Sequence, residues 1–264
     1  MDRPDGVPLP TRVAVVIPAK DEADRIAATV SAARAIPGVD RVVVVDDGSR
    51  DATSRRAHDA GAEVVRHPRN RGKAAALESG VAALGAQVDG AIGSPDGPEQ
   101  APPALLFVDA DLGETAAATA ALIGPVLAGE ADMTIAILPP QARAGGGHGF
   151  VVRLSRMGVR NATGWTPTQP LSGMRCLTWD AFQAARPLAD GWGVETALTI
   201  DLLVAGYRVI EVPCELQHRV TGADWRGQLH RAAQYRDVAR ALAVRRLRRS
   251  APLKVLRWLP RRGG

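Results

Sequence analysis

Short, continuously apolar runs alternate with longer amphipathic stretches over most of the chain. Three such runs lie within residues 12–17, 42–45 and 105–108, and each precedes a segment in which apolar residues recur every three or four positions. Continuous apolar strands are typical of a parallel sheet covered on both faces, and the three-to-four spacing predicts helices. The pattern predicts an α/β fold in which helices flank a mostly parallel central sheet with right-handed crossovers.

Further elements follow from the same pattern. We expect Pro18 to close the first strand, because proline lacks the N–H that a sheet ladder needs. Additional strands are expected at residues 62–68, 131–138 and 207–216. Additional helices are expected at residues 150–162 and 194–206, and again beyond residue 217.

Composition divides the chain into one main domain and its extensions. We expect residues 1–11 to be an N-terminal extension, residues 12–220 the main domain, and residues 221–264 a basic helical C-terminal extension. Residues 86–103 are rich in glycine, proline and small polar residues, which is typical of a mobile surface insertion. Residues 139–149 include four glycines within five positions and predict a flexible flap.

Acidic residues follow the predicted strands at the point where each strand ends. The segments 18–22, 46–49 and 109–111 should lie on one rim, because ligands of such sheets bind beyond the carboxyl ends of the strands. Asp109 and Asp111 are two residues apart in an extended segment, so both carboxylates point the same way. Two such carboxylates repel each other unless a cation neutralises them, and Mg²⁺ prefers oxygen ligands. The alternative is a strand end followed by an aspartate that caps a turn.

The turns after the first two strands indicate a phosphate-bearing ligand. Helix N-termini just beyond these turns offer unpaired N–H groups and a positive dipole end. Asp46 and Asp47 could accept hydrogen bonds from a ribose or from a base. Helix capping is the alternative for both residues and for Asp51.

Charge and cysteine content remove several classes of function. The formal charge of +5 could indicate nucleic acid, but the basic residues have no interleaved aromatic platform and match no nucleic-acid module. We therefore expect no nucleic-acid partner. Cys176 and Cys214 lack a metal-ligand spacing, which fits a reducing cytosol. Since there is neither a secretory leader nor an apolar run of the roughly 20 residues that span a bilayer, we expect a cytoplasmic protein.

Many of the basic residues gather near the C-terminus. They are Arg245, Arg246, Arg248, Arg249, Lys254, Arg257, Arg261 and Arg262. With Leu247, Trp258 and other apolar residues among them, they could lie on an anionic bilayer at the inner face of the plasma membrane. A solvated helix with a frayed tail explains the same composition. Pro252 and Pro260 prevent one uninterrupted helix.

A second basic set lies beside the predicted flap. Arg153, Arg156 and Arg160 are spaced by three and four residues, so they share one face of a helix. They could face a diphosphate or an anionic acceptor. A solvated basic face is the alternative.

Six motifs carry a resemblance to a known family. They are VVIPAKDE, VVVVDDGSRDAT, NRGKAAAL, FVDADL, LSGMRCL and GWGVETALTIDLLVAGYRVIEVP, and they occur in order within residues 12–220. In this order and spacing the chain resembles family 2 type glycosyltransferases, particularly polyprenyl-phosphate sugar transferases and glucosyl-3-phosphoglycerate synthases. The resemblance implies the GT-A fold, a Rossmann-like nucleotide-diphospho-sugar transferase fold. The chain departs from many relatives in PAKDE, where they have Asn before the Glu, and in the Ala that follows Gly72 and Lys73.

The resemblance implies roles for residues that match the nucleotide-binding motifs. Pro18, Ala19 and Glu22 match the first nucleotide-contact turn, in which Glu22 would hold the ribose. Asp47 matches the acid that contacts the base or ribose. Lys73 matches a segment near the base and the phosphates.

It also implies a metal site and a donor-sugar site. Asp109 and Asp111 match the Asp-x-Asp signature, with Asp111 favoured as the direct ligand of Mg²⁺ or Mn²⁺. His218 resembles a third metal ligand, and a solvated or packed histidine is the alternative. His148 and His230 are not expected to be ligands. The donor sugar would be lined by Leu171, Ser172 and Gly173.

Glu195 is the candidate on the acceptor side. By resemblance it would contact the sugar hydroxyls or take the acceptor proton, and a general base contributes on the order of 10²- to 10⁴-fold. Helix capping is its alternative role. Asp190 is the reserve candidate.

Taken with these residues, the resemblance implies an enzyme that moves a sugar from a nucleotide-diphosphate sugar, with UDP favoured, to an acceptor. The cation would stabilise charge on the departing diphosphate. Polyprenyl phosphate at the membrane is the favoured acceptor, and a small anionic acceptor such as 3-phosphoglycerate is the alternative. A sugar nucleotidyltransferase is disfavoured because VVIPAKDEADR lacks that class's Gly-rich signature. A non-catalytic nucleotide-binding protein is disfavoured because the acidic motifs are intact. The oligomeric state is not predicted.

Overall fold

A seven-stranded mixed sheet forms the centre of the protein. The computed structural model describes residues 9–92, 101–139, 148–215 and 225–250. The strands are β1 (Val13–Ala19), β2 (Val39–Asp46), β3 (Glu63–Arg66), β4 (Ala104–Phe107), β5 (Met133–Ile137), β6 (Arg175–Leu177) and β7 (Val209–Pro213). Their spatial order is β3-β2-β1-β4-β6-β5-β7, and β6 runs antiparallel to both of its neighbours while the other pairs are parallel. The predicted α/β fold with a mostly parallel sheet is therefore confirmed.

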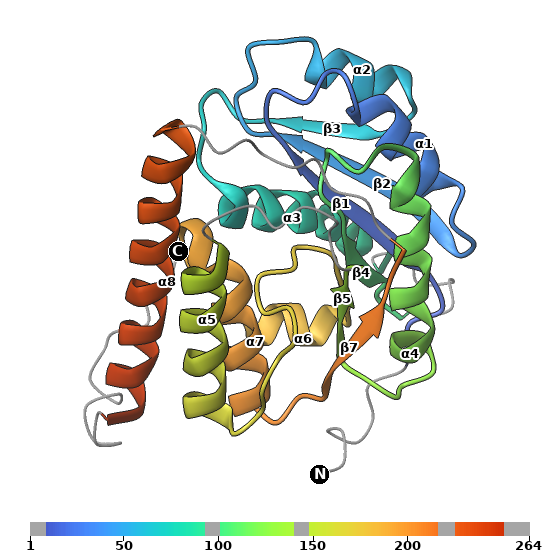
Figure 1. Ribbon diagram of the computed structural model, residues 1–264. Coiled ribbons are helices and arrows are strands. Elements are labelled where there is room, and N and C mark those ends of the chain that lie inside the picture. The colour runs from blue at the N-terminus through green and yellow to red at the C-terminus, as the bar shows by residue number, and fades with distance from the viewer. Residues whose placement is uncertain (1–8, 93–100, 140–147, 216–224, 251–264) are drawn as a thin grey trace.

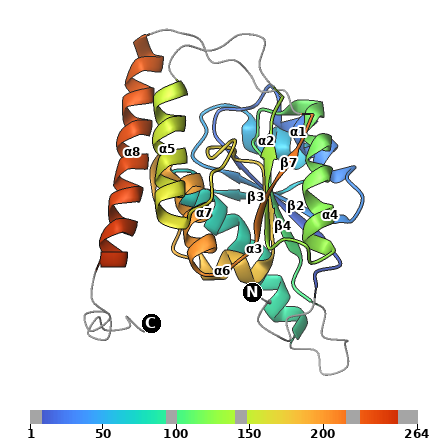
Figure 2. The same ribbon diagram turned by 60° about the horizontal axis from the view of Figure 1, so that its bottom comes forward.

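Helices cover both faces of this sheet. The helical elements are α1 (Ile26–Arg34), α2 (Thr53–Asp59), α3 (Lys73–Ile92), the 3-10 helix η1 (Gly113–Leu122), α4 (Ile123–Leu127), α5 (His148–Thr163), α6 (Trp179–Ala184), the 3-10 turn η2 (Gly191–Gly193), α7 (Val194–Val204) and α8 (Trp225–Ser250). The helices α1, α2 and α4 with η1 cover one face, and α3, α6 and α7 cover the other (Figures 1 and 2).

Alternate residues of the apolar strands supply the two halves of the core. Val13, Val15 and Ile17 of β1 pack towards α1, whereas Ala14 and Val16 pack towards α3. This two-sided burial is the reason that the strand is continuously apolar. Outside α7, helices α5 and α8 form a further layer, which Figure 2 shows at the left of the molecule.

Three boundaries differ from those predicted from the sequence. Pro18 lies inside β1 and pairs with Val45 instead of closing the strand. Helix α3 continues to Ile92, so the first part of the predicted insertion at 86–103 is helical. Residues 86–92 can continue the helix because they contain two alanines, one glycine and no proline, whereas the prolines of the predicted insertion all follow residue 92. Helix α5 begins at His148, within the predicted flap at 139–149.

Other predictions fall partly on residues outside the described ranges. Residues 140–147 of the predicted flap lie outside them. The C-terminal extension includes α8, which packs against α5, α7 and η2. Within the described residues, no helix is both long and apolar enough to cross a membrane.

Candidate active site

The ends of β1, β2 and β4 open onto one cavity of about 460 Å³. Beside β1 the sheet order changes direction, since β2 lies on one side and β4 on the other. Such a switch point leaves a crevice beyond the carboxyl ends of the strands. The cavity is lined by Pro18, Ala19, Lys20, Glu22, Asp47, Asn70, Gly72, Lys73, Ala76, Asp109, Ala110, Asp111, Gly191, Trp192 and Glu195. Every nucleotide-binding candidate and both candidate acids of the Asp-x-Asp segment therefore meet here.

Lys73 joins two of the predicted acids. Its Nζ lies 2.7 Å from Asp109 Oδ1 and 3.0 Å from Glu195 Oε1. Burial lowers the pKa of Lys73, but the charges of the two carboxylates outweigh that effect, so its pKa lies above the ordinary lysine value. The lysine is thus a permanent cation at the centre of the cavity.

The turn that carries Asp109 and Asp111 is held by its backbone. The hydroxyl of Thr29 on α1 donates to Ala110 O at 2.8 Å and accepts the N–H of Gly113, also at 2.8 Å. Arg25 donates from Nη1 to Asp111 O at 3.0 Å. These bonds fix the main chain and leave both aspartate side chains directed at the cavity that they line.

Asp47 has protein partners for both of its oxygens. Oδ1 accepts the N–H of Arg71 and Oδ2 that of Gly72, each at 2.8 Å. Oδ1 also lies 2.7 Å from Nδ1 of His67, whose other ring nitrogen is 2.9 Å from Ser79 Oγ. Asp47 therefore positions the loop before α3, and the predicted contact with a base or ribose stays a prediction.

The backbone N–H groups of the turn after β1 already donate hydrogen bonds within the protein. The N–H of Glu22 donates to Thr53 Oγ1 at 2.9 Å, and that of Ala23 donates to Asp51 at 3.1 Å. Asp51 also accepts the N–H of Thr53, the first residue of α2, although the residue at the N-cap position is Ala52. Because these donors are engaged, the first turn supplies fewer backbone groups to a phosphate than the sequence suggested.

Beside the main cavity lies a hollow of about 250 Å³ that shares Asp109 with it. Leu171, Ser172 and Gly173 line this hollow, where the sequence predicts the donor sugar. The Ser172 hydroxyl is buried and has no hydrogen-bond partner among the described residues. A buried hydroxyl of this kind is suited to a ligand that supplies the missing partner.

Arg175 holds the Leu171–Gly173 loop in place through hydrogen bonds. Its guanidinium donates to Ser172 O at 2.9 Å, to Pro170 O at 3.2 Å and to Thr199 Oγ1 at 2.9 Å. Burial lowers the pKa of Arg175 to about 10, and the charge of Glu195 opposes that shift. The arginine stays charged near neutral pH and ties the loop to α7.

Glu195 stands at the start of α7, with its side chain 11% exposed. Close packing between η2 and α8 sets its position, since a Cβ on Gly193 would lie 2.7 Å from that of Ala241. Asp190 lines a separate hollow with Asp237 and is not among the residues that line the main cavity. The geometry favours Glu195 over the reserve candidate.

The basic residues singled out in the sequence have different positions and contacts in the structure. Arg156 donates to the carbonyls of Pro167 and Thr168, at 2.9 and 2.6 Å, so it supports a loop. Arg153 and Arg160 are exposed on α5 and are not among the residues that line the cavity. Arg245, predicted as part of a basic tail, is buried and paired with Asp201 of α7. Helical spacing turns it inward with Val238 and Ala241, which the count of charges did not reveal.

The histidine predictions cannot be placed. His218 lies outside the described residues, as do the side chains of His148 and His230. Across the described part of the chain, no three His, Cys, Asp or Glu side chains are grouped closely enough to hold a metal ion. The metal-ligand role of Asp109 and Asp111 therefore stays a prediction.

The sequence did not predict a role for three residues that support the site. Thr29, His67 and Arg175 each contact a loop that lines it, Thr29 and His67 from a distant part of the chain and Arg175 from only three residues beyond Ser172. Thr29 and His67 lie outside the six motifs, and Arg175 lies within LSGMRCL without having been given a role. A charged residue at the start of the otherwise apolar strand β6 was a signal for Arg175, since a buried charge requires partners.

Comparison with known proteins agrees with the geometry. Residues 14–141 match the family described as Glycosyl transferase family 2. Glycosyltransferase AglJ of Haloferax volcanii is 29% identical over 225 residues, covering 83% of this chain and 67% of the relative. Glucosyl-3-phosphoglycerate synthase of Mycolicibacterium paratuberculosis is 30% identical over 212 residues, covering 72% of this chain and 59% of the relative.

Solved structures show the same relationship in three dimensions. Glucosyl-3-phosphoglycerate synthase from Mycobacterium tuberculosis, in complex with Mn²⁺, uridine diphosphate and phosphoglyceric acid, superimposes with a TM-score of 0.68. It is 26% identical, and the match covers 89% of this chain and 78% of that one. With the acidic strand ends gathered at one cavity, these findings make the chain similar to family 2 glycosyltransferases, and its fold is that of the GT-A glycosyltransferase structures.

Proposed function

We propose that the protein transfers a sugar from a UDP-sugar, with Mg²⁺ or Mn²⁺, to an acceptor that carries a phosphate. The observation that carries the proposal is the meeting of Asp109, Asp111, Lys73 and Glu195 at one cavity next to the Leu171–Gly173 hollow. The similar synthase that holds Mn²⁺ and uridine diphosphate supports the choice of donor and cation.

The donor set fits such a cation. Asp109 and Asp111 offer carboxylate oxygens to the same cavity, and their turn is fixed by Thr29 and Arg25. Hard divalent cations bind one or two carboxylates and complete their shell with water and substrate phosphates, so two aspartates suffice. Asp111 would hold the cation with Asp109, whose Oδ1 is shared with Lys73. Bound there, the cation would act as a Lewis acid on the diphosphate leaving group.

Lys73 would stabilise the leaving group from the protein side. Its ammonium lies at the junction of the cavity and the hollow, and it stays charged because two carboxylates flank it. A fixed cation in a partly closed site stabilises developing negative charge more strongly than it would in water. Ser172 and Gly173 would orient the sugar beside this cation.

The acceptor decides what Glu195 has to do. A phosphate oxygen is already an anion and needs no base, whereas a hydroxyl must lose a proton. One oxygen of Glu195 is engaged by Lys73, so the carboxylate serves as an orienting group and counter-ion at least as well as a base. This favours a polyprenyl phosphate acceptor. A hydroxyl of a small acid such as 3-phosphoglycerate is the second candidate, favoured by the similar synthase that binds phosphoglyceric acid.

Nucleotide release tests the proposed donor chemistry. We expect UDP release from a UDP-sugar to require the divalent ion and to fall at least about 100-fold in Asp111→Ala, since a transition-state charge loses its counter-ion. Asp59→Ala is the matched control, because that carboxylate is 65% exposed at the end of α2. Turnover by Asp111→Ala at the wild-type rate without metal would refute the proposal.

Product analysis and the variant Glu195→Gln distinguish between the two candidate acceptors. With a labelled donor, transfer to polyprenyl phosphate gives a product that extracts into organic solvent, and transfer to phosphoglycerate gives one that stays in water. If the acceptor is a phosphate oxygen, Glu195→Gln should lower kcat by about tenfold or less. If it is a hydroxyl, the loss should be on the order of 10²- to 10⁴-fold.

A further inference from the structure

Exposed apolar side chains gather on α5 and α8. Of the eight large apolar side chains that are exposed among the described residues, five lie on these two helices. They are Phe150, Met157, Tyr235, Val244 and Leu247, and Phe150 and Leu247 are 73% and 70% exposed. Tyr235 and Val244 are nine residues apart and lie on opposite sides of α8, so the apolar surface considered is the one that Phe150 and Met157 form on α5 beside α8.

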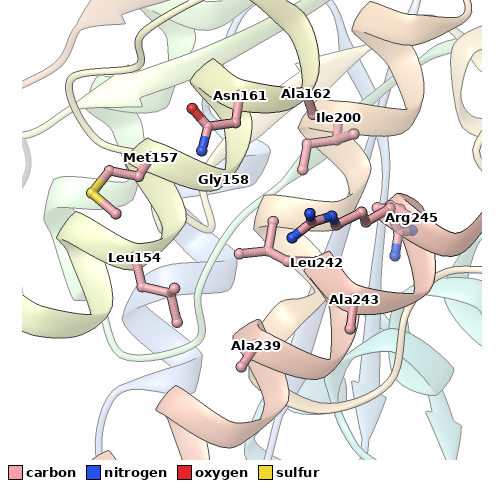
Figure 3. A pocket seen from close by; sticks show the side chains of 11 residues that line it. Leu154, Met157, Gly158, Asn161, Ala162, Ile200, Ala239, Leu242, Ala243 and Arg245 are labelled. Atoms are coloured by element: carbon pink, nitrogen blue, oxygen red, sulfur yellow. The ribbon is translucent and has the colours of Figure 1, made fainter. Parts of the chain in front are cut away.

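A groove of about 700 Å³ runs between the same helices, larger than the candidate active site. Figure 3 shows Leu154 and Met157 of α5 opposite Ala239 and Leu242 of α8, with Ile200 of α7 behind them. The helices approach closely because α5 has a glycine at the crossing, where a Cβ on Gly158 would lie 2.3 Å from Leu242. The groove therefore results from the way in which the two helices pack.

The charge of this surface has one sign. Residues 148–163 contain no Asp or Glu, and residues 225–250 contain one, Asp237. Asp237 is turned towards η2, where it accepts the N–H of Trp192 at 3.3 Å. Arg153, Arg160 and Arg240 are exposed. The surface therefore offers cations and apolar groups, with no exposed carboxylate among the described side chains of the two helices.

Along α5 the two kinds of side chain alternate on a single stripe. Phe150, Arg153, Met157 and Arg160 are all exposed and are spaced by three, four and three residues, so they lie on one face of the helix. Such a face suits an interface between charged headgroups and hydrocarbon, where the apolar side chains insert and the cations meet lipid phosphates. A purely polar anion would leave the apolar groups exposed, and a neutral apolar partner would leave the cations unmatched.

From these observations we infer that the surface formed by α5 and α8 docks on an anionic phospholipid bilayer. The docking surface is connected to the active site. A hollow lined by Gly191, Asp237 and Arg245 shares Gly191 with the catalytic cavity and Arg245 with the groove. Docking would thus bring the cavity near the bilayer, where a lipid phosphate acceptor resides. Only this last step rests on the proposed function.

Vesicle sedimentation of the full-length chain tests the inference. We expect the protein to sediment with vesicles that contain phosphatidylglycerol and to stay in solution with pure phosphatidylcholine. Each cation near such a surface contributes about fivefold to partitioning, so Arg153→Gln with Arg160→Gln should weaken binding about 25-fold. Binding of the wild type should also fall as salt rises, because the attraction is screened.

Matched variants separate binding through this surface from binding through another part of the chain. Met157→Glu places a charge on the surface at a side chain that is 51% exposed, and we expect about tenfold weaker binding. Val204→Glu makes the same change at a residue of α7 that is 52% exposed, and we expect no loss. Circular dichroism and metal-dependent UDP release, both unchanged in Met157→Glu, would show that the fold and the donor site are intact.

Three results would overturn the inference. The first is a wild-type protein that does not bind vesicles containing phosphatidylglycerol. The second is a loss of binding in Val204→Glu as large as that in Met157→Glu. The third is binding that is lost in Arg257→Gln with Arg261→Gln but kept in the α5 double variant, which would place the contact in the tail. Because vesicle binding and UDP release are measured separately, failure of the docking surface and failure of the proposed function can be told apart.

Discussion

Gly173 lies against the charged pair of Lys73 and Asp109, and those two side chains are the nearest groups that a methyl group there would meet. A Cβ built on Gly173 would lie 2.4 Å from Lys73 Nζ and 2.8 Å from each carboxylate oxygen of Asp109. Ordinary van der Waals contact begins at 3.4 Å, so in Gly173→Ala the lysine nitrogen must move by about 1 Å. Both neighbours are ends of flexible side chains, and they can move without the backbone.

The expected result is a loss of activity without a loss of stability. A misplacement of about 1 Å within a catalytic group costs on the order of 10²-fold in rate, so kcat/KM for the UDP-sugar should fall by about that factor. The free energy of unfolding should change by less than about 1 kcal/mol, which corresponds to at most about 4 °C in Tm for a chain of this size. Steady-state UDP release and thermal unfolding measure the two quantities.

Gly124→Ala is the matched control. No atom lies within 4 Å of its built Cβ, and the residue is in helix α4, so activity should stay at the wild-type level and stability should hold or rise. The reasoning would be refuted if Gly173→Ala kept kcat/KM within about threefold of wild type. It would also be refuted if that variant lost stability in proportion to its activity, since the effect would then act through the fold.

Three further predictions concern groups outside the donor-sugar loop. Arg245→Ala should lower the free energy of unfolding by about 2–4 kcal/mol in urea titrations, because the partly buried Asp201 loses its partner; recovery of less than half in Arg245→Ala with Asp201→Asn would argue against an electrostatic cause. His67→Gln should raise KM for the donor about tenfold and leave kcat nearly unchanged, because His67 positions the loop before α3; an equal fall in kcat with an unchanged KM would contradict this role. Burial raises the pKa of Cys214 to about 11 and that of Cys176 further, so at pH 8 roughly one Cys214 thiol in a thousand is ionised. Both should resist a thiol reagent at pH 8 until urea is added, and Cys214 should begin to react as the pH rises towards 11, whereas rapid labelling of the folded protein at pH 8 would contradict its burial.

The sequence by itself determined the sheet, most of its helices and the rim on which the site lies. Strands β1 and β4 and residues 42–45 of β2 are continuously apolar because both faces are covered, and that pattern can be read from the sequence directly. Parallel strands then place their carboxyl ends at one edge, which brought Glu22 and Asp111 to the same cavity. The six motifs also indicated the family resemblance, because their order along the chain can be read from the sequence.

Only the tertiary structure decided how the charges pair. Lys73 begins α3, yet it contacts Asp109 after β4 and Glu195 on α7, and no spacing along the chain relates these three. Asp47 turned out to hold a loop through backbone N–H groups that periodicity does not locate. Such partnerships depend on loop paths and on distances of a few ångströms, because the energy of a charge pair or hydrogen bond falls steeply beyond contact.

The same division holds for the basic residues. Composition showed that cations are abundant near the C-terminus, but it could not show that Arg245 is buried against α7 while Arg153 and Arg160 are exposed on α5. Which side of a helix faces inward is set by the helix against which it packs, and the partner of α8 is known once the chain has folded. Amount of charge is thus a property of the sequence, and its placement on a surface is a property of the packing.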